Sequence, residues 1–189
     1  MRQRESVLQG AIVEMLELEV ALDRALRDQI DDFDAEHPDI VHHLKYIATF
    51  VSAHIAQLRA LASRDATISG RLGSVARRAG SLVAGFSASA VNFVRNPRVP
   101  DNLRQDYSDA CRAYAGYRML FTTASALREG AACRMAAEFL SDYSRITLLL
   151  QDLLPDAVVT QLEADGLHLE EPVIRSRNAN RLEQLAVQA

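Results

Sequence analysis

Apolar residues recur at alternating steps of three and four along four stretches of the chain, residues 5–33, 37–64, 101–128 and 130–154. This spacing places apolar side chains on one face of a helix and leaves the opposite face polar. The pattern therefore predicts four long amphipathic helices. Their apolar stripes are Leu8, Ile12, Met15, Leu22, Leu26 and Phe33; Leu44, Ile47, Val51, Ile55, Leu58 and Leu61; Leu103, Tyr107, Ala110, Tyr114, Tyr117, Phe121, Ala124 and Leu127; and Ala132, Met135, Phe139, Tyr143, Ile146, Leu150 and Leu153.

Proline, aspartate and glycine mark the ends of these stretches. Pro38 suits the first turn of the second helix, and Asp101 suits the N-cap of the third. A tight break at Glu129 and Gly130 separates the third helix from the fourth. Pro155 is expected to stop the fourth helix, because proline lacks a backbone N–H. A short helix over residues 156–165 would follow.

Residues 65–100 are rich in Gly, Ala and Ser and form a long connection between the second and third helices. Short turns join the helices of each pair, so the members of a pair are expected to lie antiparallel. A bundle with one long crossover has the ferritin-like topology. We therefore predict one all-α domain over residues 1–166, an antiparallel ferritin-like four-helix bundle. The tail, residues 167–189, has the pattern of one more short helix.

Composition limits the function in two ways. The formal net charge of -4 argues against a general nucleic-acid binder. No apolar run reaches the ~18–20 residues that a membrane span needs, and the N-terminus lacks the apolar core of a signal peptide. We expect a cytoplasmic protein in which Cys111 and Cys133 are buried free thiols.

Charge is spread unevenly along the chain. Residues 1–40 carry 11 acids against four Arg, whereas residues 66–100 carry five Arg and no acid. The basic segment, residues 66–100, could bind an anionic lipid surface, pair with the acidic end of the first helix, or form a crossover helix with a solvated basic face. We favour the crossover helix, because the chain has no Trp to sit at a membrane interface. The basic residues are Arg71, Arg77, Arg78, Arg95 and Arg98.

Glu19 and His54 each interrupt an apolar stripe near the middle of a predicted helix. Antiparallel packing would allow the two side chains to meet in the core. A functional interpretation is a metal site or a proton relay. We favour a hydrogen-bonded structural pair, because a buried charge needs a partner.

The segment His42-His43-Leu44-Lys45-Tyr46 resembles the signature of histidine phosphotransfer domains. That resemblance implies phosphate transfer to an exposed His42, with Lys45, the only lysine of the chain, stabilising the anion. Tyr46 stands where the signature has a glycine, whose small size lets a partner approach. We favour a polar helix face over a phosphotransfer site, because short motifs often match by chance.

Residues 98–166 resemble the second half of small bacterial ferritin-like proteins associated with stress. The resemblance rests on LRQDY, YRMLFTTASAL and LLPDAVVTQLEADG. It implies inward carboxylates on the third and fourth helices that would bind two metal ions. The corresponding positions here carry no ligand for iron: Ala110, Ala113, Tyr114, Tyr117, Phe139, Tyr143 and Ile146.

The inventory of ligands also opposes a di-iron centre, which needs about six inward Glu and His side chains. No carboxylate lies between Asp109 and Glu129. No histidine lies between His54 and His168. Glu138 and Asp142 fall beside the apolar stripe, so neither is given a ligand role.

Tyrosines predict an aromatic layer whose hydroxyls hydrogen-bond across the core. The layer would consist of Tyr107, Tyr114, Tyr117 and Tyr143.

We therefore expect a protein without an enzymatic activity or a cofactor, which acts by oligomerisation or partner binding, in connection with stress. A two-fold homodimer is the simplest assembly. The alternatives are an iron or manganese protein that uses Glu19 and His54, a phosphotransfer module, and a lipid-surface binder that uses residues 71–98.

Overall fold

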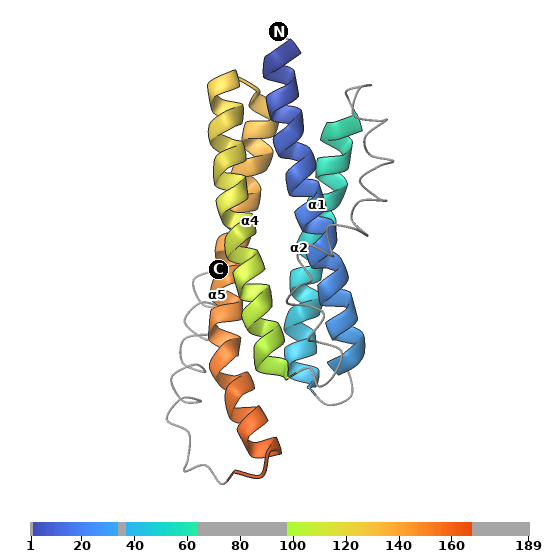
Figure 1. The fold of residues 1–189 in the computed structure, drawn as a ribbon, viewed down its shortest axis with the longest axis vertical. Coiled ribbons are helices and arrows are strands. Elements are labelled where there is room, and N and C mark those ends of the chain that lie inside the picture. The colour runs from blue at the N-terminus through green and yellow to red at the C-terminus, as the bar shows by residue number, and fades with distance from the viewer. Residues whose placement is uncertain (1, 34–36, 64–97, 168–189) are drawn as a thin grey trace.

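Four long helices make up the described part of the chain (Figure 1). The computed structural model describes residues 2–33, 37–63 and 98–167, with no strand among them. The helices are α1 (Arg2–Phe33), α2 (Pro38–Ser63), α4 (Val99–Leu127) and α5 (Gly130–Ala164). The fold is therefore an all-α bundle, as the periodicity predicts. The predicted connection and tail lie almost wholly outside the described residues.

Each helix packs mainly against two neighbours. α1 contacts α2 and α4, and α5 contacts α4 and α2. Apolar side chains from all four helices fill the space between them, and this burial is the main source of stability. The largest fully buried aliphatic side chains are Leu16, Leu26, Leu44, Ile47, Leu58, Leu103, Leu120, Ile146 and Leu150. None of the described helices is long and apolar enough to cross a membrane.

The buried face of α4 contains half of the predicted stripe, namely Leu103, Ala110, Tyr117 and Ala124. Tyr107 and Phe121 are only partly buried, and Tyr114 is exposed, whereas Asp106, Ala113 and Leu120 face the core. Neighbouring residues lie about 100° apart around a helix, so the buried face extends toward Asp106, Ala113 and Leu120 rather than toward the aromatic residues that follow them. The predicted stripe was incomplete because the buried face also carries the polar residues Asn102 and Asp106.

Two predicted helix ends and one burial prediction are also wrong. Arg98, in an extended conformation, is the N-cap of α4, and Asp101 lies in the first turn. α5 continues through Pro155 to Ala164. Proline removes only one backbone hydrogen bond, and the buried Ala157 keeps the following turn packed on the core. Cys111 is exposed and Cys133 is half-buried, although both are free thiols as expected.

A two-residue break turns the chain from α4 into α5. Arg128, with φ 62° and ψ 34°, adopts the left-handed conformation, and its N–H contacts the Ser125 carbonyl oxygen at 3.1 Å. A side chain with a Cβ atom is strained in this conformation, whereas glycine is not.

Arg128→Gly is therefore expected to raise the free energy of unfolding by about 0.5–1 kcal/mol. The gain is smaller than the full strain, because glycine also makes the unfolded chain more flexible. Urea unfolding followed by circular dichroism measures it. Arg118→Gly, at an exposed interior position of α4, is the control and should lower stability by about 1 kcal/mol. Equal losses in both variants would contradict this account of the turn.

Candidate functional site

Glu19 of α1 is the centre of a polar layer inside the bundle. Its side chain is 0% exposed. The Tyr117 hydroxyl of α4 donates to Glu19 Oε1 at 2.5 Å, and the Tyr143 hydroxyl of α5 donates to Oε2 at 2.8 Å. His54 Nδ1 of α2 lies 3.1 Å from Oε1. One carboxylate thus binds side chains from each of the other three helices.

His54 connects this carboxylate to a second one nearer the surface. Its Nε2 atom lies 3.2 Å from Asp142 Oδ2, and the Asp142 side chain is 18% exposed. The imidazole ring stacks on Phe139, with ring centroids 3.8 Å apart and planes 28° from parallel. An imidazole that carries protons on both nitrogens donates to both carboxylates. The stacked ring and its two polar contacts therefore determine the orientation of His54.

Both tyrosine hydroxyls stay protonated in this environment. Burial raises the pKa of Tyr117 and of Tyr143 well above the ordinary value, and the nearby Glu19 carboxylate raises both further. A neutral hydroxyl is a hydrogen-bond donor, which is what a buried carboxylate requires. The two phenol rings also stack on each other, with centroids 5.6 Å apart.

The contact between Glu19 and His54 is present, and it takes the form of a hydrogen-bonded buried pair. Of the predicted aromatic layer, only Tyr117 and Tyr143 lie in the core. Asp142 is the polar partner that sequence reasoning missed. The sequence offered one indication of this role, because Asp142 directly precedes Tyr143, a residue of the predicted apolar stripe.

These residues do not fit a di-iron centre. Both oxygens of Glu19 already accept hydrogen bonds from tyrosine hydroxyls. At this level α4 contributes Tyr117, whose protonated hydroxyl donates to Glu19 and is not a carboxylate ligand. Within residues 2–33, 37–63 and 98–167, no three His, Cys, Asp or Glu side chains are grouped so that they could hold a metal ion. A metal role for Glu19 and His54 stays a prediction without geometric support.

A second buried polar layer lies between α1 and α4. Gln29 Nε2 donates to Asp106 Oδ1 at 2.9 Å. Asp106 is only 1% exposed, and Asn102, one turn earlier on α4, is 3% exposed. Three oxygens of this layer have no hydrogen-bond partner: Gln29 Oε1, Asn102 Oδ1 and Asp106 Oδ2. Burial raises the pKa of Asp106 to about 7, although the Gln29 hydrogen bond opposes the rise.

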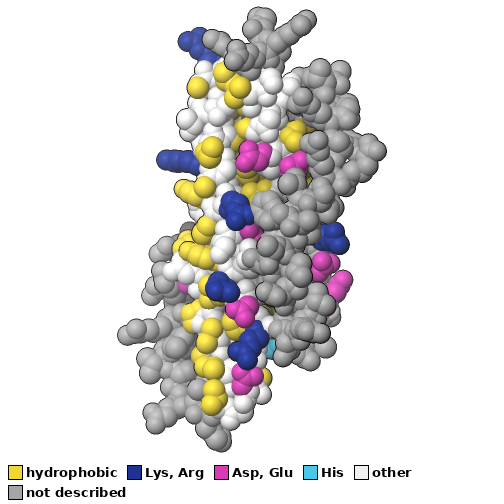
Figure 2. All heavy atoms as spheres, viewed as in Figure 1, with side chains coloured by type: hydrophobic (Ala, Val, Ile, Leu, Met, Phe, Trp, Pro, Cys, Tyr) yellow, Lys and Arg dark blue, Asp and Glu magenta, His cyan; other side chains and the backbone are white. Residues whose placement is uncertain are grey.

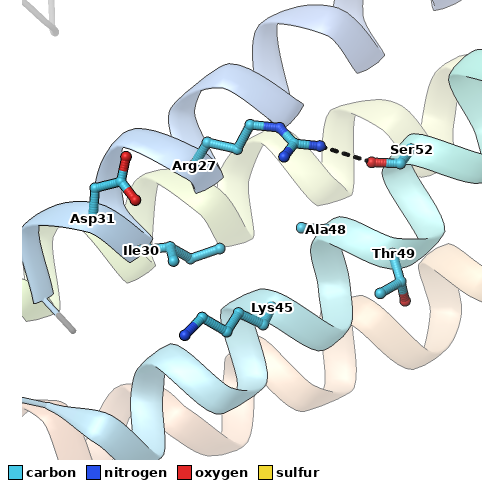
Figure 3. A pocket seen from close by; sticks show the side chains of 7 residues that line it. All are labelled: Arg27, Ile30, Asp31, Lys45, Ala48, Thr49 and Ser52. Atoms are coloured by element: carbon cyan, nitrogen blue, oxygen red, sulfur yellow. Dashed lines mark hydrogen bonds between the residues drawn. The ribbon is translucent and has the colours of Figure 1, made fainter.

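A groove of about 610 Å³ lies between α1 and α2 (Figure 3). The groove contains the cationic side chain of Arg27, but this side chain is not available to bind an anion. Arg27 donates to both oxygens of Asp23, at 2.8 and 3.0 Å, and also to Ser52 at 3.1 Å. The guanidinium is therefore already neutralised by a carboxylate. The lining residues are Arg27, Ile30, Asp31, Lys45, Ala48, Thr49 and Ser52.

The proposed phosphotransfer residues, His42 and Lys45, are both exposed on α2. His42 packs edge-on against His43, with ring centroids 5.6 Å apart. Their exposure fits a polar helix face and also a phosphotransfer site, so the motif stays a prediction. Of the basic segment, only Arg98 lies in the described part of the chain, where it is exposed.

Comparisons with protein-family models, with curated proteins and with solved structures gave no match. The structure itself shows an all-α bundle with a buried layer formed by Glu19, His54, Tyr117 and Tyr143.

Tyr117→Phe is expected to lower the free energy of unfolding by about 1.5–3 kcal/mol, because it removes a hydrogen bond to a buried charged group. Tyr114→Phe is the matched control on the same helix. Tyr114 is exposed, so its variant should change stability by less than about 0.5 kcal/mol. Chemical denaturation of both variants gives the comparison. Equal stability of the two variants would show that the layer contributes little.

Proposed function

We propose that this chain is a non-catalytic, ferritin-like four-helix bundle that acts by self-association, in a cytoplasmic process connected with stress. The observation that carries the non-catalytic part is the state of Glu19. Its two oxygens receive three contacts from three other helices, so the carboxylate is committed to holding the bundle together.

The connectivity supports the ferritin-like part of the proposal. Short segments join α1 to α2 and α4 to α5, whereas residues 64–97 separate α2 from α4. The colours of Figure 1 show successive helices within each pair running in opposite directions. A long crossover between two antiparallel pairs is the ferritin-like arrangement.

Apolar side chains on the surface support self-association. Figure 2 shows them running along the side of the molecule formed by α4 and α5. On α4, Met119 is 71% exposed and Tyr114 is 37% exposed, and on α5 Leu148 is 43% exposed. Contiguous exposed apolar surface is typical of protein–protein interfaces. A second copy of the chain is the occupant that we propose, since two-fold homodimers are the commonest assembly of soluble proteins.

The proposal predicts a dimer by sedimentation velocity at micromolar concentration, over a range of salt concentrations. Met119→Glu should increase the dissociation constant at least about tenfold, because it would place a charge in a desolvated contact. Val7→Glu is the control, since Val7 is an exposed apolar residue of α1. A monomer at every salt concentration would refute self-association. Equal weakening by both variants would place the contact elsewhere.

A further inference from the structure

We infer that the layer of Gln29, Asn102 and Asp106 is a proton-binding site that controls the contact between α1 and α4. Protonated Asp106 closes the layer, and deprotonated Asp106 loosens it. This inference does not depend on the proposed self-association.

The layer contains acceptors without a matching donor. The Gln29 amide N–H donates to Asp106 Oδ1, while three buried oxygens of the layer have no partner. Asn102 and Asp106 are four residues apart on α4, so their side chains are neighbours on one helix face. A proton on Asp106 Oδ2 would turn one acceptor into a donor and offer it to the other unpartnered oxygens. A single proton is therefore the smallest ligand that improves the layer.

The charges around Asp106 also favour the proton. Asp109, one turn along α4, adds a repulsive negative charge. α1 contributes the neutral Gln29 and the apolar Leu26 and Phe33. α5 carries a further buried acid, Asp152, which is 6% exposed. Among residues 2–33, 37–63 and 98–167, no Lys or Arg forms an ion pair with Asp106.

The direction of the pH effect follows from the raised pKa. An unfolded Asp has a pKa of about 3.9, whereas that of Asp106 in the folded protein is about 7. Between these values the folded state holds the proton and the unfolded state does not. Stability from this group is complete below about pH 4 and falls as the pH rises to about 7.

The test compares urea unfolding of wild type and Asp106→Asn at about pH 5, 6, 7 and 8. Over the lower part of this range, one group can raise the wild-type unfolding constant by up to about tenfold per pH unit. Asp106→Asn keeps the shape of the side chain but cannot bind or release the proton, so the unfolding constant of this variant should lack the pH dependence due to Asp106. Asp28→Asn is the control, because Asp28 is exposed on α1, and it should retain the wild-type slope. Equal slopes in wild type and Asp106→Asn would overturn the inference.

A second measurement keeps the inference testable if Asp106→Asn does not fold. The ¹³C chemical shift of the Asp106 carboxyl, followed through a pH titration of the wild-type protein, reports its protonation directly. A midpoint near pH 7 is expected. A midpoint near the ordinary value of about 4 would contradict a proton-binding layer.

Discussion

The requirement to satisfy one buried carboxylate organises the centre of this bundle. Glu19 is fully buried, and an isolated charge in an apolar core is strongly unfavourable. Donors from the other three helices compensate for the lost water. Only one relative rotation of the four helices brings Tyr117, Tyr143 and His54 to the same carboxylate. The polar layer thus selects one packing among the many that apolar contacts alone would allow.

The two polar layers solve the problem of burial in different ways. At Glu19 both carboxylate oxygens have hydrogen-bond partners, and Asp142 continues the network toward the surface. At Asp106 three buried oxygens have no hydrogen-bond partner. The first layer thus has a partner for each oxygen of its buried carboxylate, whereas the second layer can gain a donor if Asp106 binds a proton. The same helices therefore carry a structural layer and a layer whose state depends on the solution.

Sequence periodicity predicted the helices and marked Glu19 and His54 as residues that could meet in the core, but it identified only part of the buried face of α4. Glu19 and His54 stood out because each broke an otherwise apolar stripe. Asp106 did not stand out, because a polar residue beside an aromatic stripe looks solvent-exposed. Its burial brings it against Gln29 of another helix. Such tertiary contacts have no signal within a single helix.

The completeness of the Glu19 layer also bears on where function can lie. A catalytic or metal-binding carboxylate needs a free position for its substrate or ion, and the hydrogen bonds at Glu19 use both oxygens. Its partners could be released only by repacking stacked rings in a close-packed core, which is energetically costly. The surface has no such constraint, since Met119 and Tyr114 are available without any rearrangement. Recognition at the α4 and α5 surface therefore requires less structural change than chemistry in the core.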